Sequence, residues 1–295
     1  MATGLVPSST HELVRNVVVS PLSGLDGVGH CDVRPLVTAL DGAVCGDAAL
    51  SGLGGRFLFA LDDGRGDVID GSFDLGFIAT GPERGVVLAG SGPRAWPVAL
   101  GEAVPTLLDL AREFADRTAG RTNAWHVDEL DAPLGPPTTL SFTPPAPPPR
   151  PLGVVGEHAV AAVPLGLLRR RHVDALARVT DAVRVTPWRS LVVEQGAAHL
   201  HHLEDAGLAT HVGSPWHRLH ACTGLPGCGR SAIDTRDLAR DLAPVLPPGT
   251  LPVHVSGCER RCGTPSTAYV DLLAPRSLDE ALATLSAHDP ARETA

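Results

Sequence analysis

The sequence predicts an α+β protein in which two copies of one α/β module flank a small half-domain. The first observation behind this prediction is an internal repeat, in which Ser20 and the phrase Asp32-x-Arg34-x-Leu36-x-x-x-Leu40 recur as Cys222 and Asp234-x-Arg236-x-Leu238-x-x-x-Leu242. The second is that apolar residues recur at three- and four-residue spacing after both phrases, as on one face of a helix. The third is a proline-rich stretch between the two copies, which is typical of a linker.

The first module is expected over residues 11–120, and its elements follow from apolar periodicity. We predict a strand, a turn, a helix, three strands and a second amphipathic helix, at 17–19, 21–24, 33–45, 56–61, 73–79, 85–89 and 103–117. Residues 121–152 are predicted to be a linker, since prolines crowd its second half and such segments are stiff and extended.

A ferredoxin-like half-domain is expected over 153–215, and a second copy of the module over 216–290. The elements predicted for the half-domain are strand, helix, strand and helix, at 154–163, 171–182, 183–194 and 197–207. In the second copy, a strand at 251–256 leads to Cys258 and a final helix covers 278–287. This copy retains cysteines that the first copy lacks.

Composition excludes several classes of function. The net charge of −9 argues against a nucleic-acid partner, and no apolar run approaches the length of a membrane span. The N-terminus has no basic region followed by an apolar stretch, so a cytoplasmic protein is expected. In that compartment, clustered cysteines favour metal binding over disulfides. All 24 basic residues are arginine, which excludes any mechanism that needs a lysine.

Four cysteines in the last quarter of the chain are the most specific chemical signal. Cys222 and Cys228 are separated by five residues, and Cys258 and Cys262 by three. Four thiolates that converge on one point make an iron–sulfur or a zinc site. The wide first pair, with small residues between its cysteines, favours a bulky iron–sulfur core over a zinc knuckle.

These phrases resemble the sirohaem-dependent nitrite and sulfite reductase superfamily, and within it the precorrin-3B synthases most. The residues that carry the resemblance are Ala221-Cys222-Thr-Gly-Leu-Pro-Gly-Cys228 and Val255-Ser-Gly-Cys258-Glu-Arg-Arg-Cys262, supported by the segments 15–24, 55–63 and 184–189. The resemblance covers most of the chain between about residue 14 and about residue 270. It implies two reductase-type modules, of which only the second holds a cluster.

The resemblance also implies the cofactors and their ligands. In the superfamily, this cysteine pattern holds a [4Fe–4S] cluster, and the last cysteine, here Cys262, bridges the cluster to the iron of sirohaem. Buried thiols and a zinc site are the alternatives for the four cysteines. The family also has a second half-domain before the first module, where this chain has about ten residues. We therefore expect either a shortened chain or a partner chain that supplies the missing half-domain.

Four arginines match positions that the family uses around the cofactor and its substrate, and two more lie between the last two cysteines. Arg15 and Arg56 are predicted to act on the substrate side of sirohaem. The arginines predicted to bind cofactor carboxylates or to neutralise the cluster are Arg184, Arg189, Arg260 and Arg261. A planar guanidinium suits carboxylates, of which sirohaem carries eight. The alternative for each arginine is an ordinary surface salt bridge.

The resemblance implies an oxidoreductase of aerobic cobalamin biosynthesis. A precorrin-3B synthase uses O2 and an electron donor to hydroxylate precorrin-3A and to form a lactone on it. A sirohaem-dependent nitrite or sulfite reductase is the alternative, and the absence of lysine argues against it, as does Leu58, which stands where the reductases place a lysine. A catalytically incomplete fragment that only binds a cluster is the third reading.

Overall fold

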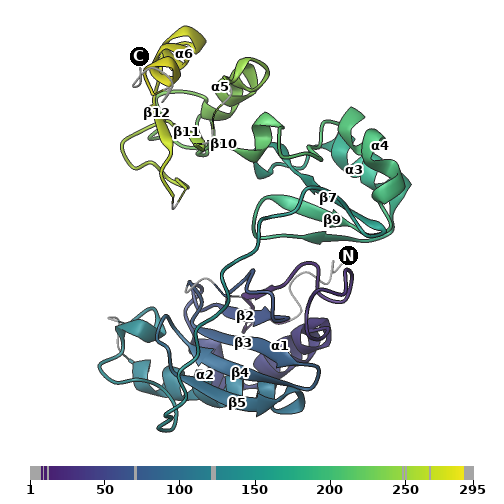
Figure 1. The fold of residues 1–295 in the computed structure, drawn as a ribbon. Coiled ribbons are helices and arrows are strands. Elements are labelled where there is room, and N and C mark those ends of the chain that lie inside the picture. Colours follow the sequence, from purple (N-terminus) through teal and green to yellow (C-terminus); the bar gives the residue numbers. More distant parts are fainter. Residues whose placement is uncertain are drawn as a thin grey trace, which may run out of the picture. The chain divides into compact units, whose positions relative to one another are not determined.

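The computed structural model describes residues 8, 10–11, 13–69, 72–120, 124–247, 249, 251–265 and 267–288. The chain divides into two compact units, with the boundary between Arg150 and Pro151 (Figure 1). None of the helices formed by these residues combines the length and the apolar character needed to cross a membrane.

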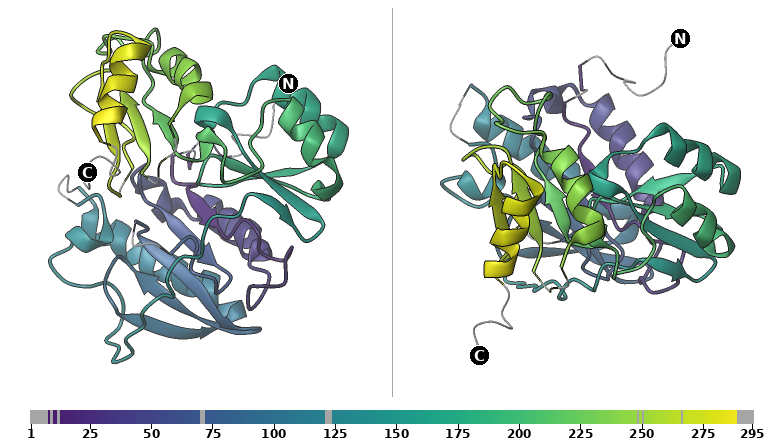
Figure 2. Two further views of the ribbon diagram at one scale, coloured as in Figure 1. Left: turned by 45° about the horizontal axis from the view of Figure 1, so that its top comes forward. Right: turned by 90° about the horizontal axis from the view of Figure 1, so that it is seen from above.

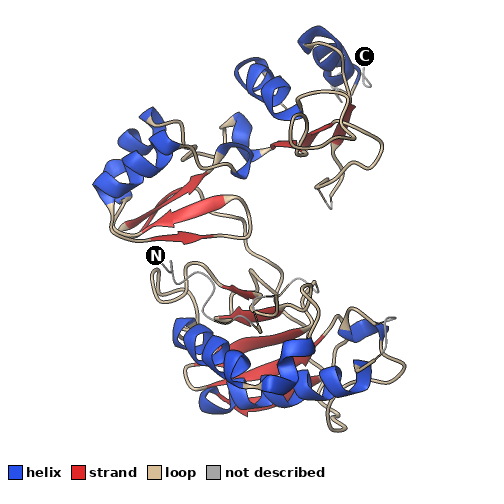
Figure 3. Ribbon diagram, turned by 180° about the vertical axis from the view of Figure 1, so that it is seen from behind, coloured by secondary structure: helices blue, strands red, loops and turns tan. Residues whose placement is uncertain are grey.

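The first unit is built on a five-stranded mixed sheet. Its strands lie in chain order, β1 (Val17–Val19), β2 (Phe59–Asp62), β3 (Leu75–Gly81), β4 (Arg84–Ala89) and β5 (Ala95–Ala99). The first three strands are parallel, and β3, β4 and β5 pair antiparallel. The helices α1 (Arg34–Gly46) and α2 (Ala103–Thr118) cover one face of this sheet (Figure 3).

The core of the first unit lies between this face and the two helices. Leu40 of α1 and Leu107 of α2 are fully buried, as the helical spacing of apolar residues predicted. Aromatic rings fill the centre: Phe57 lies 5.2 Å from Phe59 and 5.1 Å from Phe114, measured between ring centroids. Edge-on and tilted rings of this kind add to the stabilisation from buried area.

The linker before the unit boundary is shorter than the proline content predicted. Residues 127–142 pack against the first unit: Leu134 is 3% exposed, and the indole of Trp96 donates to the Pro136 carbonyl at 3.1 Å. A short bridge joins Arg94 to Ser141. Prolines leave their own carbonyls available as acceptors, so a proline-rich segment can still be fixed to a sheet edge. Continuous exposure begins only at residue 145.

The second unit contains two sheets. The first is a four-stranded antiparallel sheet in the order β6 (Gly153–Val155), β7 (His158–Ala162), β9 (Ser190–Val193), β8 (Val183–Val185). The helices α3 (Arg170–Val179) and α4 (Leu200–Asp205) pack their apolar residues on it. Each long strand predicted here, 154–163 and 183–194, is in fact a hairpin. The turns lie at Gly156, which has a φ of 59°, and at the segment that ends with Arg189, which also has a φ of 59°.

The other sheet of the second unit has three parallel strands in the order β10 (Leu219–Ala221), β11 (Val253–Ser256), β12 (Val270–Leu273). The helices α5 (Thr235–Leu242) and α6 (Leu278–Ala287) lie side by side and pack against this sheet (Figure 2). Apolar residues at alternate positions of the strands, such as Val253 and Val255, are fully buried in this small core.

The predicted internal repeat is visible in this architecture. β1 and β10 match at the offset that aligns Ser20 with Cys222, and in both copies a helix connects the first strand to a parallel neighbour. The shared aspartate acts at the start of each helix: Asp32 accepts from the Arg34 N–H at 3.0 Å, and Asp234 from the Arg236 N–H at 3.1 Å. The first copy differs by the added hairpin of β4 and β5.

Candidate metal and cofactor site

The cysteines of the second unit follow two neighbouring parallel strands. Cys222 comes directly after β10, and Cys258 comes two residues after β11. Because the carboxyl ends of parallel neighbours meet at one edge of a sheet, the two cysteine loops start side by side. This edge is also where α/β sheets place their ligands.

Hydrogen bonds hold the two loops together. The Cys222 N–H donates to the Val255 carbonyl at 3.0 Å, and the Gly257 N–H points at the sulfur of Cys222 at 3.3 Å. The Ala232 N–H donates to the Gly257 carbonyl at 2.9 Å. The Cys222 thiol is therefore held against the backbone that leads to Cys258.

Close packing against α5 shapes the loop between Cys222 and Cys228. Gly224 has a φ of 65°, and a Cβ at this position would collide with the hydroxyl of Thr235. A Cβ at Gly257 would collide with the hydroxyl of Ser231 in the same way. Glycine is required at both positions, because the backbone of each loop lies directly on its neighbour.

All six cysteines of the chain are thiols in this structure. Three of the four in the predicted set are partly buried and Cys262 is exposed. Among the residues that the structure describes, no group of three His, Cys, Asp or Glu side chains is arranged to hold a single metal ion. The donor chemistry nevertheless fits an iron–sulfur cluster: four thiols on two interlocked loops, with small residues where the backbone must wrap.

The first unit carries the same backbone arrangement without the cysteines. The Ser20 N–H donates to the Leu61 carbonyl at 3.0 Å, and the Asp63 N–H donates to the Ser20 hydroxyl at 3.2 Å. The His30 N–H then donates to the Asp63 carbonyl at 2.7 Å. These three bonds repeat those of Cys222, Gly257 and Ala232, so Ser20 stands in the place of the first cysteine.

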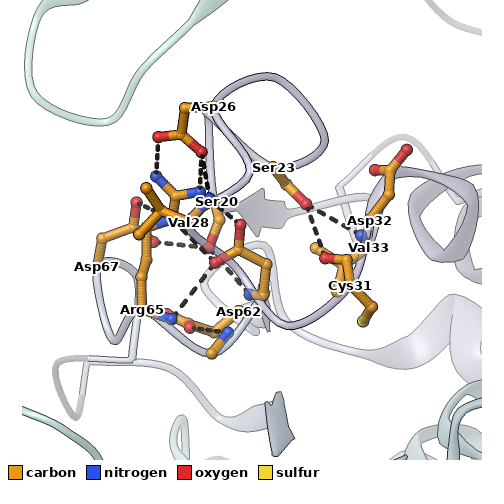
Figure 4. A network of polar contacts seen from close by, with 12 residues as sticks. Ser20, Ser23, Asp26, Val28, Cys31, Asp32, Val33, Asp62, Arg65 and Asp67 are labelled. Atoms are coloured by element: carbon orange, nitrogen blue, oxygen red, sulfur yellow. Dashed lines mark hydrogen bonds and ion pairs between the residues drawn. The ribbon is translucent and has the colours of Figure 1, made fainter. Parts of the chain in front are cut away.

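A buried arginine and carboxylates lie between the corresponding loops of the first unit (Figure 4). Asp26 lies at the repeat position of Cys228, and both of its oxygens accept from the Arg65 guanidinium at 2.9 Å. Arg65 also donates to both oxygens of Asp63, at 2.9 and 2.7 Å. The Arg65 side chain is only 7% exposed. A buried ion pair cluster therefore fills the space between the two loops in this copy.

Burial perturbs the acids of this network. Desolvation raises the pKa of Asp67 to about 7, against the opposing hydrogen bond from Ser20 at 2.6 Å. Desolvation also raises the pKa of Asp62, although three backbone N–H groups donate to that carboxylate. The guanidinium of Arg65 offsets part of the cost of burying the carboxylates around it.

Three of the six predicted arginines, Arg15, Arg184 and Arg261, pair with carboxylates of their own unit. Arg15 makes a two-pronged contact with Asp41 at 2.6 and 2.9 Å. Arg184 donates to Glu194 at 2.7 Å. Arg56, of the first unit, and Arg260, between the last two cysteines, are exposed. The structure therefore shows salt bridges for Arg15 and Arg184, and the cofactor and substrate roles of these four residues stay predictions.

Arg189 and Arg261 mark the two ends of a polar row across the three-stranded sheet. Arg189 donates to Nδ1 of His220 at 2.8 Å, and Arg261 donates to Asp271 at 2.6 Å. Between them, the strand register places His254 of β11 beside both His220 of β10 and Asp271 of β12. Desolvation and the charge of Arg189 lower the pKa of His254. The row thus connects two predicted cofactor residues with the loop of the last cysteines.

Sequence reasoning missed His220, His254 and Asp271. The alternation Val253-His254-Val255-Ser256 just before Cys258 was the available signal, because it puts two polar side chains on one face of a strand. The strands β10 and β12, which carry the other two residues of the row, are too short to stand out by periodicity.

No family model matches the chain. Two curated proteins do: the precorrin-3B synthase of Sinorhizobium sp. is 26% identical over 298 aligned positions, which cover 88% of this chain and 63% of that protein. The ferredoxin–nitrite reductase of Synechococcus elongatus is 26% identical over 329 positions, which cover 89% and 62%. The chain is thus similar in sequence to two proteins of the nitrite and sulfite reductase superfamily.

A solved structure shares the fold. The NirA protein of Mycobacterium tuberculosis superposes with a TM-score of 0.58 at 22% identity, over 82% of this chain and 54% of that one. The chain thus spans a little over three fifths of the length of the two curated members of the superfamily that it matches. The reductase-type α+β fold predicted from the sequence is confirmed.

Proposed function

We propose that this chain is the cluster-bearing part of a precorrin-3B synthase-like oxidoreductase of the cytoplasm. The reaction would be the O2-dependent hydroxylation of precorrin-3A with lactone formation, supported by an external electron donor. The observation that carries the proposal is the pair of interlocked cysteine loops at the ends of β10 and β11. The similarity to a precorrin-3B synthase supports the choice of substrate.

In this proposal, Cys222, Cys228, Cys258 and Cys262 hold a [4Fe–4S] cluster. Cys262 is the exposed thiol of the four, which suits the residue assigned to the bridge with sirohaem iron. The cluster and the iron would supply electron transfer and O2 activation, chemistry that no side chain of the protein can provide. The protein contributes binding, burial and charge.

The chain's own residues balance the negative charge of such a cofactor pair. Arg260 and Arg261 lie between the last two ligands, and Arg189 lies at the far end of the polar row. Arginine keeps its proton near neutral pH, so these side chains bind carboxylates but do not deliver protons. This property suits hydroxylation better than a reduction that consumes many protons, and Leu58 adds no proton donor in the first unit.

A sirohaem-dependent nitrite reductase is the second candidate. The nitrite reductase relative is as similar in sequence as the synthase, at 26% identity. A third candidate is a cluster-binding chain that is catalytically active only together with a partner chain. The sheet edge at β8, where Val185 is 76% exposed, is available for such a partner.

Turnover separates the candidates. The full chain, loaded with cluster and sirohaem, is supplied with a chemical reductant and either precorrin-3A with O2 or nitrite without O2. The proposal expects hydroxylated, lactone-bearing product from precorrin-3A and little consumption of nitrite. Nitrite reduction with no reaction of precorrin-3A would favour the reductase, and inactivity on both would favour the incomplete chain.

A further inference from the structure

Buried polar atoms without partners collect on one face of the three-stranded sheet. Both ring nitrogens of His254, the hydroxyl of Ser256 and one carboxylate oxygen of Asp271 are buried and lack a hydrogen-bond partner. They are four of only six such side-chain atoms among the residues that the structure describes. Each unsatisfied buried group costs about 1–3 kcal/mol, so such a concentration calls for an explanation.

These atoms share a face that the apolar core does not use. Val253 and Val255 point to the core formed with α5 and α6, so His254 and Ser256 point to the opposite face. His254 and Ser256 are both 0% exposed. The backbone of Cys262 approaches the His254 ring and favours its protonated form, but the geometry is not that of a hydrogen bond.

Cations flank this face on both sides. Arg189 reaches it through His220, and Arg261 reaches it through Asp271. Arg261 adopts a φ of 46° and is also paired with Glu259 at 2.7 Å, so its position is well determined. A surface with histidine and serine donors between two guanidinium groups suits an anionic group with several oxygen acceptors.

We infer that His254 and Ser256 bind a carboxylate on the rim of the tetrapyrrole, between Arg189 and Arg261. The inference rests on the proposed function, because the tetrapyrrole is the polyanionic group expected next to the cysteines. His254 and Ser256 would donate to the carboxylate oxygens, and Asp271 would accept from the His254 ring or from a bound water. The face leads directly from Ser256 into the loop of Cys258, which puts this subsite beside the cluster.

The test is tetrapyrrole binding by the full chain with its cluster assembled. Sirohaem is titrated into the wild-type protein and into His254→Leu, His254→Gln and Ser256→Ala, and binding is followed by the Soret absorbance. Loss of hydrogen bonds to a charged group weakens binding by about 10- to 100-fold, which is expected for His254→Leu. His254→Gln keeps a donor and should stay within about fivefold of the wild type.

Controls separate binding from folding. The iron and sulfide content of each variant must equal that of the wild type, which shows that the cluster module is folded. His201→Leu is the matched control, because the His201 side chain is 89% exposed, and its affinity should not change. Equal affinity of His254→Leu and wild type would overturn the inference and indicate that buried water satisfies these atoms. A wild-type chain that binds no sirohaem would overturn the proposed function as well.

Discussion

Removing the Arg65 guanidinium should destabilise the first unit strongly, because it would leave buried carboxylates without a counter-ion. In Arg65→Met, the carboxylates of Asp26 and Asp63 would remain in the interior, with side chains that are 10% and 1% exposed. Breaking one side of a buried ion pair costs about 3–5 kcal/mol. We expect a loss of this size in the free energy of unfolding of the first unit.

Hydrogen exchange during urea unfolding, followed peptide by peptide, measures this loss for each unit separately. Protection should fall in peptides from β1, β2 and α1, while the iron content of the second unit stays unchanged. Arg112→Met is the control: its guanidinium also pairs with two carboxylates, Asp47 and Asp109, but it is 45% exposed. Its effect should be much smaller, because surface ion pairs contribute little. If both variants lose equally little stability, the buried Arg65 ion pairs do not stabilise the first unit in the way that a cluster is expected to stabilise the second.

Three further predictions concern the two repeat-related sites. Asp67 keeps its proton up to about pH 7 in the folded state, whereas its unfolded pKa is 3.8, so stability of the first unit should decline between these pH values. Asp67→Asn should remove that decline, which amounts to about 4 kcal/mol in the free energy of unfolding at pH 8. Urea titrations at several pH values measure it. Cys228→Ser should abolish labile sulfide and lower the melting temperature of the second unit, whereas Cys45→Ser should do neither. Gly257→Ala should reduce cluster content through its collision with Ser231, and normal iron and sulfide in this variant would contradict the loop packing described.

The sequence predicted the repeat and the cysteine loops because both are local patterns. The cysteines lie within two segments of seven and five residues, and the helix-start aspartates recur at a fixed offset. The structure adds that the repeat extends to individual hydrogen bonds, with Ser20 in place of Cys222. That equivalence depends on which backbone groups meet across strands, and no local pattern encodes it.

The arginines show why site assignment from sequence falls short. Arg15 pairs with Asp41, which is 26 residues away in the sequence, and Arg184 pairs with Glu194, which is 10 residues away. Partners at such separations depend on the fold, so a guanidinium that matches a cofactor position in a pattern can be occupied by a salt bridge. The two hairpins were missed because their turns are short, at residues 156–157 and 186–189, so the apolar strands on either side were joined into one predicted strand each.

The packed segment before Arg150 is a further case. Proline content predicted an extended linker, but the segment carries a few apolar side chains that find a place on the first unit, such as Leu134. A single buried leucine contributes about 1.5–3 kcal/mol, which is enough to fix a short segment. Composition averages over the segment and therefore hides this contribution.

Anaerobic purification followed by an optical spectrum and analysis of iron and acid-labile sulfide tests the central claim most directly. We expect about four sulfides and about five irons per chain when a tetrapyrrole with a Soret band is bound, or about four irons with the cluster alone. Zinc in place of iron, or a chain with neither iron nor labile sulfide after anaerobic preparation, would contradict the assignment of Cys222, Cys228, Cys258 and Cys262 as cluster ligands.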